Sequence, residues 1–242
     1  MHSLRFLVVI VVLLPWYALA EAPRAIGSAF SPQTGELLYR ELHYGQAGLP
    51  IDKVTYVDPA GNTVAIKQLD FSRGDLSPVF TLQDLRRDLV LGARFSGDAM
   101  QLSRQEGQKT PQLSELFDSE NIVIDAGFDG FVRQRWDQLG ENRRLDFDYA
   151  FPSRLKTVKL SIREVDCDST LREWTCFEIE PSNWLVSVLL PAIVLAYDSG
   201  TRRLRNYRGL SNISDNTGKS QQVDIFYQYP DEADAQLLTS TP

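Results

Sequence analysis

The segment "KVTYVDPAGNTVAIKQLDF", residues 53–71, decides the fold class of this chain. Val54 and Tyr56 share one face of its first half, and Val64 and Ile66 share one face of its second half. This period of two is typical of half-buried strands. Between the halves, "DPAGN" supplies the Pro, Gly and Asn that favour a tight turn. The segment therefore predicts an antiparallel hairpin within a β-meander.

Similar alternation occurs on both sides of this hairpin. It is found in "ELLYRELHY" (36–44), in "RRLDFDYAF" (143–151) and in "LKTVKLSIREV" (155–165). Residues 79–105 fit either a helix or strands, and we favour strands that are broken at "SGD". Near the C-terminus, "AIVLAY" (192–197) predicts a strand buried on both faces, which opens a three-stranded meander that continues to residue 229.

Two helices are expected among these strands. The first covers 128–139, where Phe128, Phe131, Val132, Trp136 and Leu139 recur at helical spacing. Asp125 and Asp129 lie where a helix N-terminus favours acidic residues. The second is a short helix with an apolar stripe within 184–189, and it ends before Pro191 because a residue that precedes proline disfavours the helical conformation.

The N-terminus has the features of a secretory signal peptide. Arg5 precedes an apolar run at 6–14, and "ALA" at 18–20 is a typical cleavage site. We expect residues 1–20 to be removed and residues 21–242 to form one β-rich domain. Neither the apolar run at 6–14 nor the apolar stretch at 183–197 predicts a membrane span. A helix of about 14 residues reaches only about 21 Å, whereas the hydrocarbon core of a membrane is about 30 Å thick.

The composition excludes several classes of function. The formal net charge is −7 and the chain has no basic block, so nucleic acid is not an expected partner. His43 is the only histidine after residue 20, which leaves too few residues for a serine triad or a multi-histidine zinc site. Cys167 and Cys176, separated by eight residues in an exported chain, predict a disulfide. Nothing in the sequence indicates a cofactor.

Paired carboxylates are the remaining candidates for catalysis. Asp125 with Asp129, and Asp146 with Asp148, are close in sequence, and two carboxylates can hydrolyse a glycosidic bond. Helix-end electrostatics explains the first pair, and the solvent-facing side of a strand explains the second. We therefore expect a protein that is not an enzyme.

An arginine cluster follows the apolar stretch 183–197. Arg202, Arg203, Arg205 and Arg208 precede or occupy the next expected strand, and arginine binds carboxylate and phosphate groups well. If an apolar wall and a basic rim are neighbours, they suit an amphiphile with an acidic head. The residues predicted to bind a ligand are Trp184, Leu185, Leu189, Arg203, Arg205 and Tyr207. In the alternative interpretation, the apolar residues pack in the core and the arginines are solvated.

Two segments carry a family resemblance. "VIDAGFDGFVRQRWDQL" (123–139) and "VLAYDSGTRRLRNYRGLSNISD" (194–215) resemble a family of uncharacterised exported proteobacterial proteins. More loosely, the closing strands resemble the half-barrels of the periplasmic lipoprotein-carrier superfamily. The resemblance implies an α+β, mainly β fold: a curved antiparallel sheet with a few helices packed on its concave face.

These observations lead to two functional hypotheses. The first is a periplasmic, non-enzymatic protein that binds a lipid, a lipidated molecule or another apolar ligand in the cavity of the half-barrel. The second is an envelope interaction or assembly module that docks a protein partner and holds no ligand.

Overall fold

The computed structural model describes residues 21–117, 122–141, 143–168, 173–182 and 191–230. Within these ranges the chain forms one curved, unclosed sheet with helices on its concave face, as predicted. The strands are β1 (Ala25–Phe30), β2 (Leu37–Tyr44), β3 (Lys53–Val57), β4 (Thr63–Asp70), β5 (Val79–Asp84), β6 (Leu89–Ser96), β7 (Ala99–Glu106), β8 (Gln112–Leu116), β9 (Ile122–Val123), β10 (Leu145–Phe151), β11 (Lys156–Val165), β12 (Trp174–Pro181), β13 (Ile193–Asp198), β14 (Leu204–Leu210) and β15 (Gln222–Gln228).

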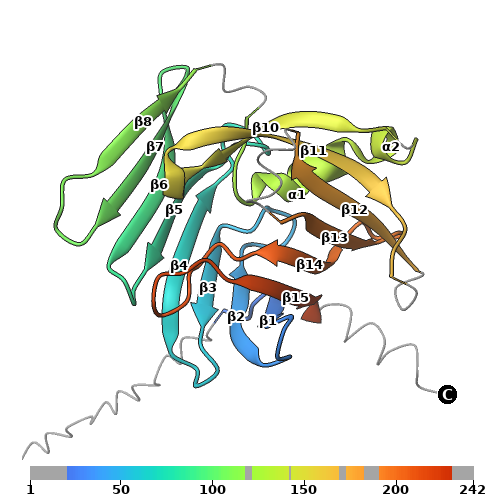
Figure 1. Cartoon of the computed structure of the whole chain (residues 1–242), viewed down its shortest axis with the longest axis horizontal. Coiled ribbons are helices and arrows are strands. Elements are labelled where there is room, and N and C mark those ends of the chain that lie inside the picture. The colour runs from blue at the N-terminus through green and yellow to red at the C-terminus, as the bar shows by residue number, and fades with distance from the viewer. Residues whose placement is uncertain (1–20, 118–121, 142, 169–172, 183–190, 231–242) are drawn as a thin grey trace, which may run out of the picture.

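The sheet has two halves, which we call wings. Strands β1–β8 form one wing, β9–β15 form the other, and the wings meet where β1 pairs with β15. The strand order is β8-β7-β6-β5-β4-β3-β2-β1-β15-β14-β13-β12-β11-β10-β9, and every pair is antiparallel except β9 with β10. In Figure 1 the blue β1 and the red β15 lie together at the bottom, the green strands β5–β8 rise on the left, and β10–β12 lie at the upper right. Strands that follow one another along the chain are thus neighbours in the sheet, except that β8 and β9 lie at its two opposite ends, and the β1–β15 pair joins the first and last described strands.

The opening hairpin forms as predicted, but its inner face differs from the expected one. A β-bulge at Tyr56/Val57 shifts the register, so that Val54 pairs with Lys67 and Tyr56 pairs with Ala65. Because directly paired residues point to the same side, Lys67 lies on the inner face instead of Ile66. The bulge places a charged side chain where the alternation predicted an aliphatic one.

The other predicted strands are confirmed. Residues 79–106 form β5, β6 and β7, with a turn at 97–98 that includes Gly97 at a φ of 63°. In β10 and β11, Phe147 pairs with Leu160 and Leu145 pairs with Ile162, as the alternation indicated. The expected C-terminal meander consists of β13, β14 and β15.

The predicted long helix is divided in two. Helix α1 covers Gly127–Gln134 and α2 covers Trp136–Leu139, with the break at Arg135. The change of direction brings the Trp136 ring onto Phe177 and Tyr197, at centroid distances of 5.3 and 5.6 Å. The aromatic stripe of the helices therefore packs on the inner face of β10–β13.

Several contacts hold the two wings together. The 3₁₀ turn Pro152–Arg154, which follows β10, packs against β6 and β7. The Ile124 amide donates to the carbonyl of Leu76 at 3.1 Å, and the Ser77 hydroxyl donates to the carbonyl of Ile122. The loop between β4 and β5 thus contacts the segment before α1 and links the two wings.

The disulfide between Cys167 and Cys176 is present, and it ties the end of β11 to β12. Among the described residues, no helix is long and apolar enough to cross a membrane. The expected helix within 184–189 lies outside the described residues.

Candidate functional site

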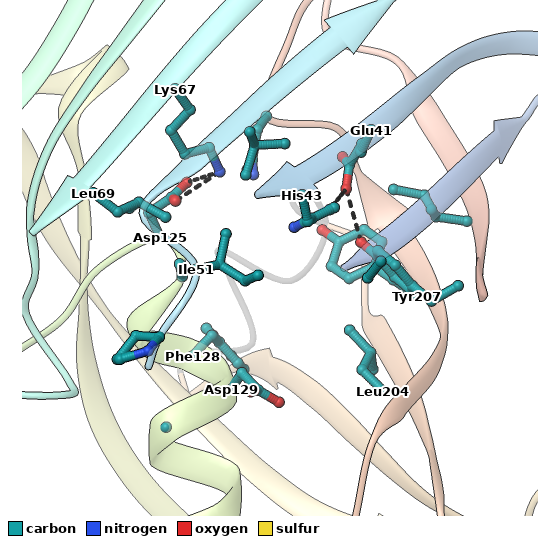
Figure 2. A pocket seen from close by; sticks show the side chains of 18 of the residues that line it. Glu41, His43, Ile51, Lys67, Leu69, Asp125, Phe128, Asp129, Leu204 and Tyr207 are labelled. Carbon is teal, nitrogen blue, oxygen red and sulfur yellow. Dashed lines mark hydrogen bonds and ion pairs between the residues drawn. The ribbon is translucent and has the colours of Figure 1, made fainter. Parts of the chain in front are cut away.

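The concave side of the sheet encloses a cavity of about 1430 Å³. Its wall includes side chains from both wings and from helix α1, and Figure 2 shows these side chains converging on a common space. Most of the wall is apolar. Its aliphatic and aromatic members include Ile51, Val54, Leu69, Phe80, Leu82, Leu91, Phe128, Leu160, Ile179, Ile193, Leu195, Leu204 and Ile225.

A buried ion pair forms one polar point of this wall. Lys67 Nζ lies 2.7 Å from Asp125 Oδ2 and 3.0 Å from Asp125 Oδ1, and both side chains are less than a tenth exposed. Burial alone would lower the pKa of the Lys67 ammonium, but the Asp125 charge and hydrogen bond outweigh it, so the pKa lies above its usual range. Asp125, whose φ is 44°, therefore neutralises a buried ammonium group in addition to lying near the N-terminus of a helix.

A second polar point lies across the cavity on β2 (Figure 2). Glu41 Oε2 accepts hydrogen bonds from Tyr227 Oη at 3.0 Å and is 3.1 Å from His43 Nε2. Burial alone would raise the pKa of Glu41, but the hydrogen bond and charge of His43, the charge of Lys67 and the Tyr227 hydrogen bond hold it below its usual value. The carboxylate thus stays ionised in a largely apolar enclosure.

Tyrosines supply the remaining polarity of the interior. Burial is the largest cause that raises the pKa of each interior hydroxyl group above its usual value, so these groups are neutral donors and acceptors at physiological pH. Tyr39 bonds Ser211 at 2.7 Å, and Tyr207 donates to the carbonyl of Leu210 at 2.7 Å. The affected tyrosines are Tyr39, Tyr56, Tyr149, Tyr197, Tyr207, Tyr227 and Tyr229.

Asp129 of α1 is a further acidic group in the wall. Its Oδ2 is 2.6 Å from Arg133 Nη2, whereas its Oδ1 is buried and has no hydrogen-bond partner in the part of the chain that the structure describes. Burial raises the pKa of the Asp129 carboxyl, and the charge and hydrogen bond of Arg133 act in the opposite direction.

The structure places the predicted ligand residues in different surroundings. Tyr207 and Arg203 line the cavity. Arg205 does not, and its guanidinium is 3.5 Å from Asp198. Both arginines stack on the Tyr229 ring, at 4.9 and 5.4 Å from its centroid. Trp184, Leu185 and Leu189 lie outside the described residues.

The other two arginines of the cluster pair with acidic residues. Arg202 lies 5.1 Å from the centre of the Trp136 ring and 3.3 Å from Asp137. Arg208 Nε is 3.2 Å from Asp224 Oδ2. The cluster therefore does not converge on a single point, because Arg203 and Arg205 meet at Tyr229 whereas Arg202 and Arg208 contact other residues.

Sequence reasoning missed Glu41, His43 and Lys67 as cavity residues. His43 lines the cavity, and its ring lies 5.7 Å from that of Tyr227. The sequence contains one indication of this arrangement: Tyr39, Glu41 and His43 are spaced two residues apart on β2 and therefore share one face of the strand. Leu38 and Leu42 have the same period on the opposite face, so the sequence pattern alone favours the wrong side.

No family model matches the chain, and the search of curated proteins finds no match. Among solved structures, the crystal structure of a β-barrel-like protein of domain of unknown function DUF1849 from Brucella abortus is similar in fold. It aligns at a TM-score of 0.46 and 8% identity, over 87% of this chain and 99% of that chain. The resemblance to exported proteins and to lipoprotein carriers stays a prediction.

Proposed function

We propose that this protein binds an amphiphilic or lipid-like ligand in the cavity and is not an enzyme. The cavity of about 1430 Å³ carries the proposal. It exceeds the roughly 300–1,000 Å³ of pockets for drug-sized ligands, so it has room for a molecule with a long apolar portion.

The lining supports an amphiphile over a fully apolar molecule. Aliphatic side chains from both wings can bury a hydrocarbon chain, at about 0.8 kcal/mol for each CH₂ group. The Lys67–Asp125 pair and the Glu41–His43 pair interrupt that surface with fixed hydrogen-bonding groups. A ligand with one polar region matches this pattern, because such a group leaves neither its own polar atoms nor those of the wall unpaired.

We include a periplasmic location in the same proposal. A disulfide fits an extracytoplasmic location, since thiols are kept reduced in the cytosol. Together with the signal peptide expected at residues 1–20, it supports export to the periplasm. A binding protein there would carry or store a ligand that is poorly soluble in water.

Lipid extraction and mass spectrometry of protein purified from its native compartment test the proposal directly. We expect a stoichiometric amphiphile in the extract. A titration with 1-N-phenylnaphthylamine, an uncharged probe that fluoresces in apolar surroundings, gives a second measurement. Purified protein that releases no ligand and does not bind the probe would overturn the proposal.

Variants that narrow the cavity make the test specific. Ile51 and Leu204 point into it (Figure 2), so Ile51→Trp and Leu204→Trp should weaken probe binding by about tenfold or more. Leu113→Trp is the matched control, because Leu113 is 54% exposed on β8 and does not line the cavity. Equal affinity in all three variants would place the probe elsewhere.

A docking role is the second candidate function. β8 is the last strand of its wing within the described residues; Leu113 in this strand is 54% exposed, and Phe117, which follows the strand, is 75% exposed. Exposed edge strands can pair with an extended segment of a partner protein. If envelope proteins bind here, Leu113→Lys with Phe117→Lys should abolish co-purification that wild-type protein shows, while cavity variants should not.

A further inference from the structure

A second, smaller pocket of about 260 Å³ adjoins the cavity. The two spaces share lining residues, among them Leu82, Leu91 and Arg154. The composition of the small pocket is different, because three arginines and several serine hydroxyls dominate its wall. We call it the arginine pocket; its cationic members are Arg87, Arg104 and Arg154.

The fold assembles the arginine pocket from three separate parts of the chain. Arg87 comes from the turn between β5 and β6, and Arg104 comes from β7. Arg154 comes from the 3₁₀ turn after β10, which the curvature brings from the opposite wing to β6 and β7. The loop between β14 and β15 completes the wall with Ser211 and Ser214.

Hydrogen bonds fix that loop in place. Arg86 Nη2 donates to the Ser214 carbonyl at 2.7 Å, and Arg86 Nη1 donates to Asn216 Oδ1 at 3.2 Å. Arg87 Nη1 reaches Ser214 Oγ at 3.3 Å. A loop that joins β14 to β15 is thus held against the β5–β6 turn, and the serine hydroxyls are positioned before any ligand binds.

The positive charge of the arginine pocket exceeds its negative charge. Asp84 is the acidic member of its wall, and Arg86 already neutralises it through contacts of 3.1 and 3.2 Å. Arg104 pairs with Glu106, but Arg87 has no carboxylate partner within 4 Å and Arg154 has neither a hydrogen bond nor an ion pair among the residues that the structure describes. Two guanidinium groups therefore lack an anion.

We propose that the arginine pocket binds a phosphate or carboxylate group, and that this group is the head of the amphiphile whose chain occupies the main cavity. Guanidinium groups bind such anions through paired, charge-assisted hydrogen bonds, and serine hydroxyls add donors. The volume accommodates a head group, since a water molecule takes about 30 Å³ of liquid. This inference rests on the proposed function and adds to it the class of ligand.

The main cavity is less suitable for an anionic head. Lys67 and Arg133 are already paired with Asp125 and Asp129, and Glu41 adds a further carboxylate. Of the other cationic residues in its wall, Arg24 donates to two backbone carbonyls and Arg203 stacks on the Tyr229 ring. An anion placed there would be buried beside like charges, which is unfavourable at low dielectric constant. We therefore assign the apolar chain and any uncharged polar part beside it to the main cavity, and the acidic head to the arginine pocket.

Calorimetric titrations with three probes test the inference. Dodecyl phosphate carries both parts of the proposed ligand, inorganic phosphate carries the head alone, and dodecyltrimethylammonium carries a head of opposite charge. The variant is Arg87→Gln with Arg154→Gln. The matched control is Arg40→Gln with Arg143→Gln, which removes the same charge from two exposed positions outside both pockets.

We expect dodecyl phosphate to bind wild-type protein at least about tenfold more tightly than dodecyltrimethylammonium, and the pocket variant to lose this preference while the control keeps it. Binding of uncharged 1-N-phenylnaphthylamine should stay the same in all proteins.

Inorganic phosphate that binds as tightly as dodecyl phosphate would support the anion site but assign it to free phosphate. Unchanged dodecyl phosphate affinity in the pocket variant, with the uncharged probe still bound, overturns the inference and leaves the proposed function standing. Failure of every apolar probe overturns both.

Discussion

The ammonium group of Lys67 lies 2.7 Å from the carboxylate of Asp125, and this contact joins the middle of β4 to the residue that precedes the N-cap of α1. The two side chains are only 5% and 8% exposed. The pair therefore anchors the start of the helix to the wing that contains β4, at the edge of the cavity. Because both charges are buried, each depends on the other for stability.

Asp125→Asn should therefore destabilise the protein by about 3–5 kcal/mol, since it leaves the Lys67 ammonium buried without its ion-pair partner. Asparagine tolerates the positive φ of 44° at this position, so the backbone is not the cause of the loss. Urea unfolding at neutral pH measures the effect. Adding Lys67→Met should restore most of the stability, and Glu141→Gln, which breaks an exposed pair with Arg143, should change it by less than about 1 kcal/mol. An Asp125→Asn protein as stable as wild type would contradict this account.

Gly127→Ala should also destabilise the fold. A Cβ atom at Gly127 would lie 1.9 Å from the carbonyl oxygen of Leu76, which is backbone and cannot move aside as a side chain can. The loop before β5 would have to separate from α1, at a cost of about 3 kcal/mol or more. Gly140→Ala is the control, because its nearest neighbour would be 3.6 Å away. Thermal unfolding of the two variants should differ clearly, and equal midpoints would show that the helix and loop do not pack as described.

The curved sheet could be predicted because its strands alternate over many residues and most strands that follow one another along the chain pair with each other. The sequence reasoning did not identify β1, β8, β9 or β12 as strands. In β1, "AIGSAF" contains small residues on both faces, and Gly27 is needed because a Cβ there would lie 2.8 Å from the Tyr227 ring. Only the tertiary contact explains that residue.

The candidate site was less predictable than the fold, for two physical reasons. The bulge at Tyr56/Val57 reverses which side of β4 faces inward, and no residue of the hairpin signals a bulge. The arginine pocket depends on curvature, because Arg87 and Arg154 belong to opposite wings and meet only when the sheet bends. The sequence drew attention instead to the arginines at 202–208, which are clustered along the chain but contact different residues in space.

Glu41 should make the stability of the protein depend on pH in the acid range. Its pKa in the folded state lies below the ordinary value of 4.5, so the unfolded chain binds more protons as the pH falls through this window. The stabilisation is thus complete above about pH 4.5 and is lost as the pH falls through the folded pKa. The difference in unfolding free energy between wild type and Glu41→Gln should therefore be larger at pH 7 than at pH 3, as measured by urea unfolding. A difference that is the same at both pH values would show that the ionised carboxylate does not contribute.

The interior tyrosines should make the fold sensitive to alkali. Their pKa values in the folded state lie above the ordinary value of 10, in the case of Tyr229 at about 12, and burial is the largest cause in each. Above pH 10 the unfolded chain therefore releases protons that the folded chain keeps, and stability falls as the pH rises. Each tyrosine that ionises only on unfolding contributes a loss of about 1.4 kcal/mol per pH unit.

Two spectroscopic titrations check this sign. Tyrosinate absorbance and far-ultraviolet circular dichroism should change together in one cooperative transition above pH 10, because the interior hydroxyl groups become accessible to base only when the sheet opens. Absorbance that rises to completion while the circular dichroism stays native would show that these hydroxyl groups are in contact with solvent. The cavity would then be an open aqueous channel, and an apolar ligand would gain little by entering it.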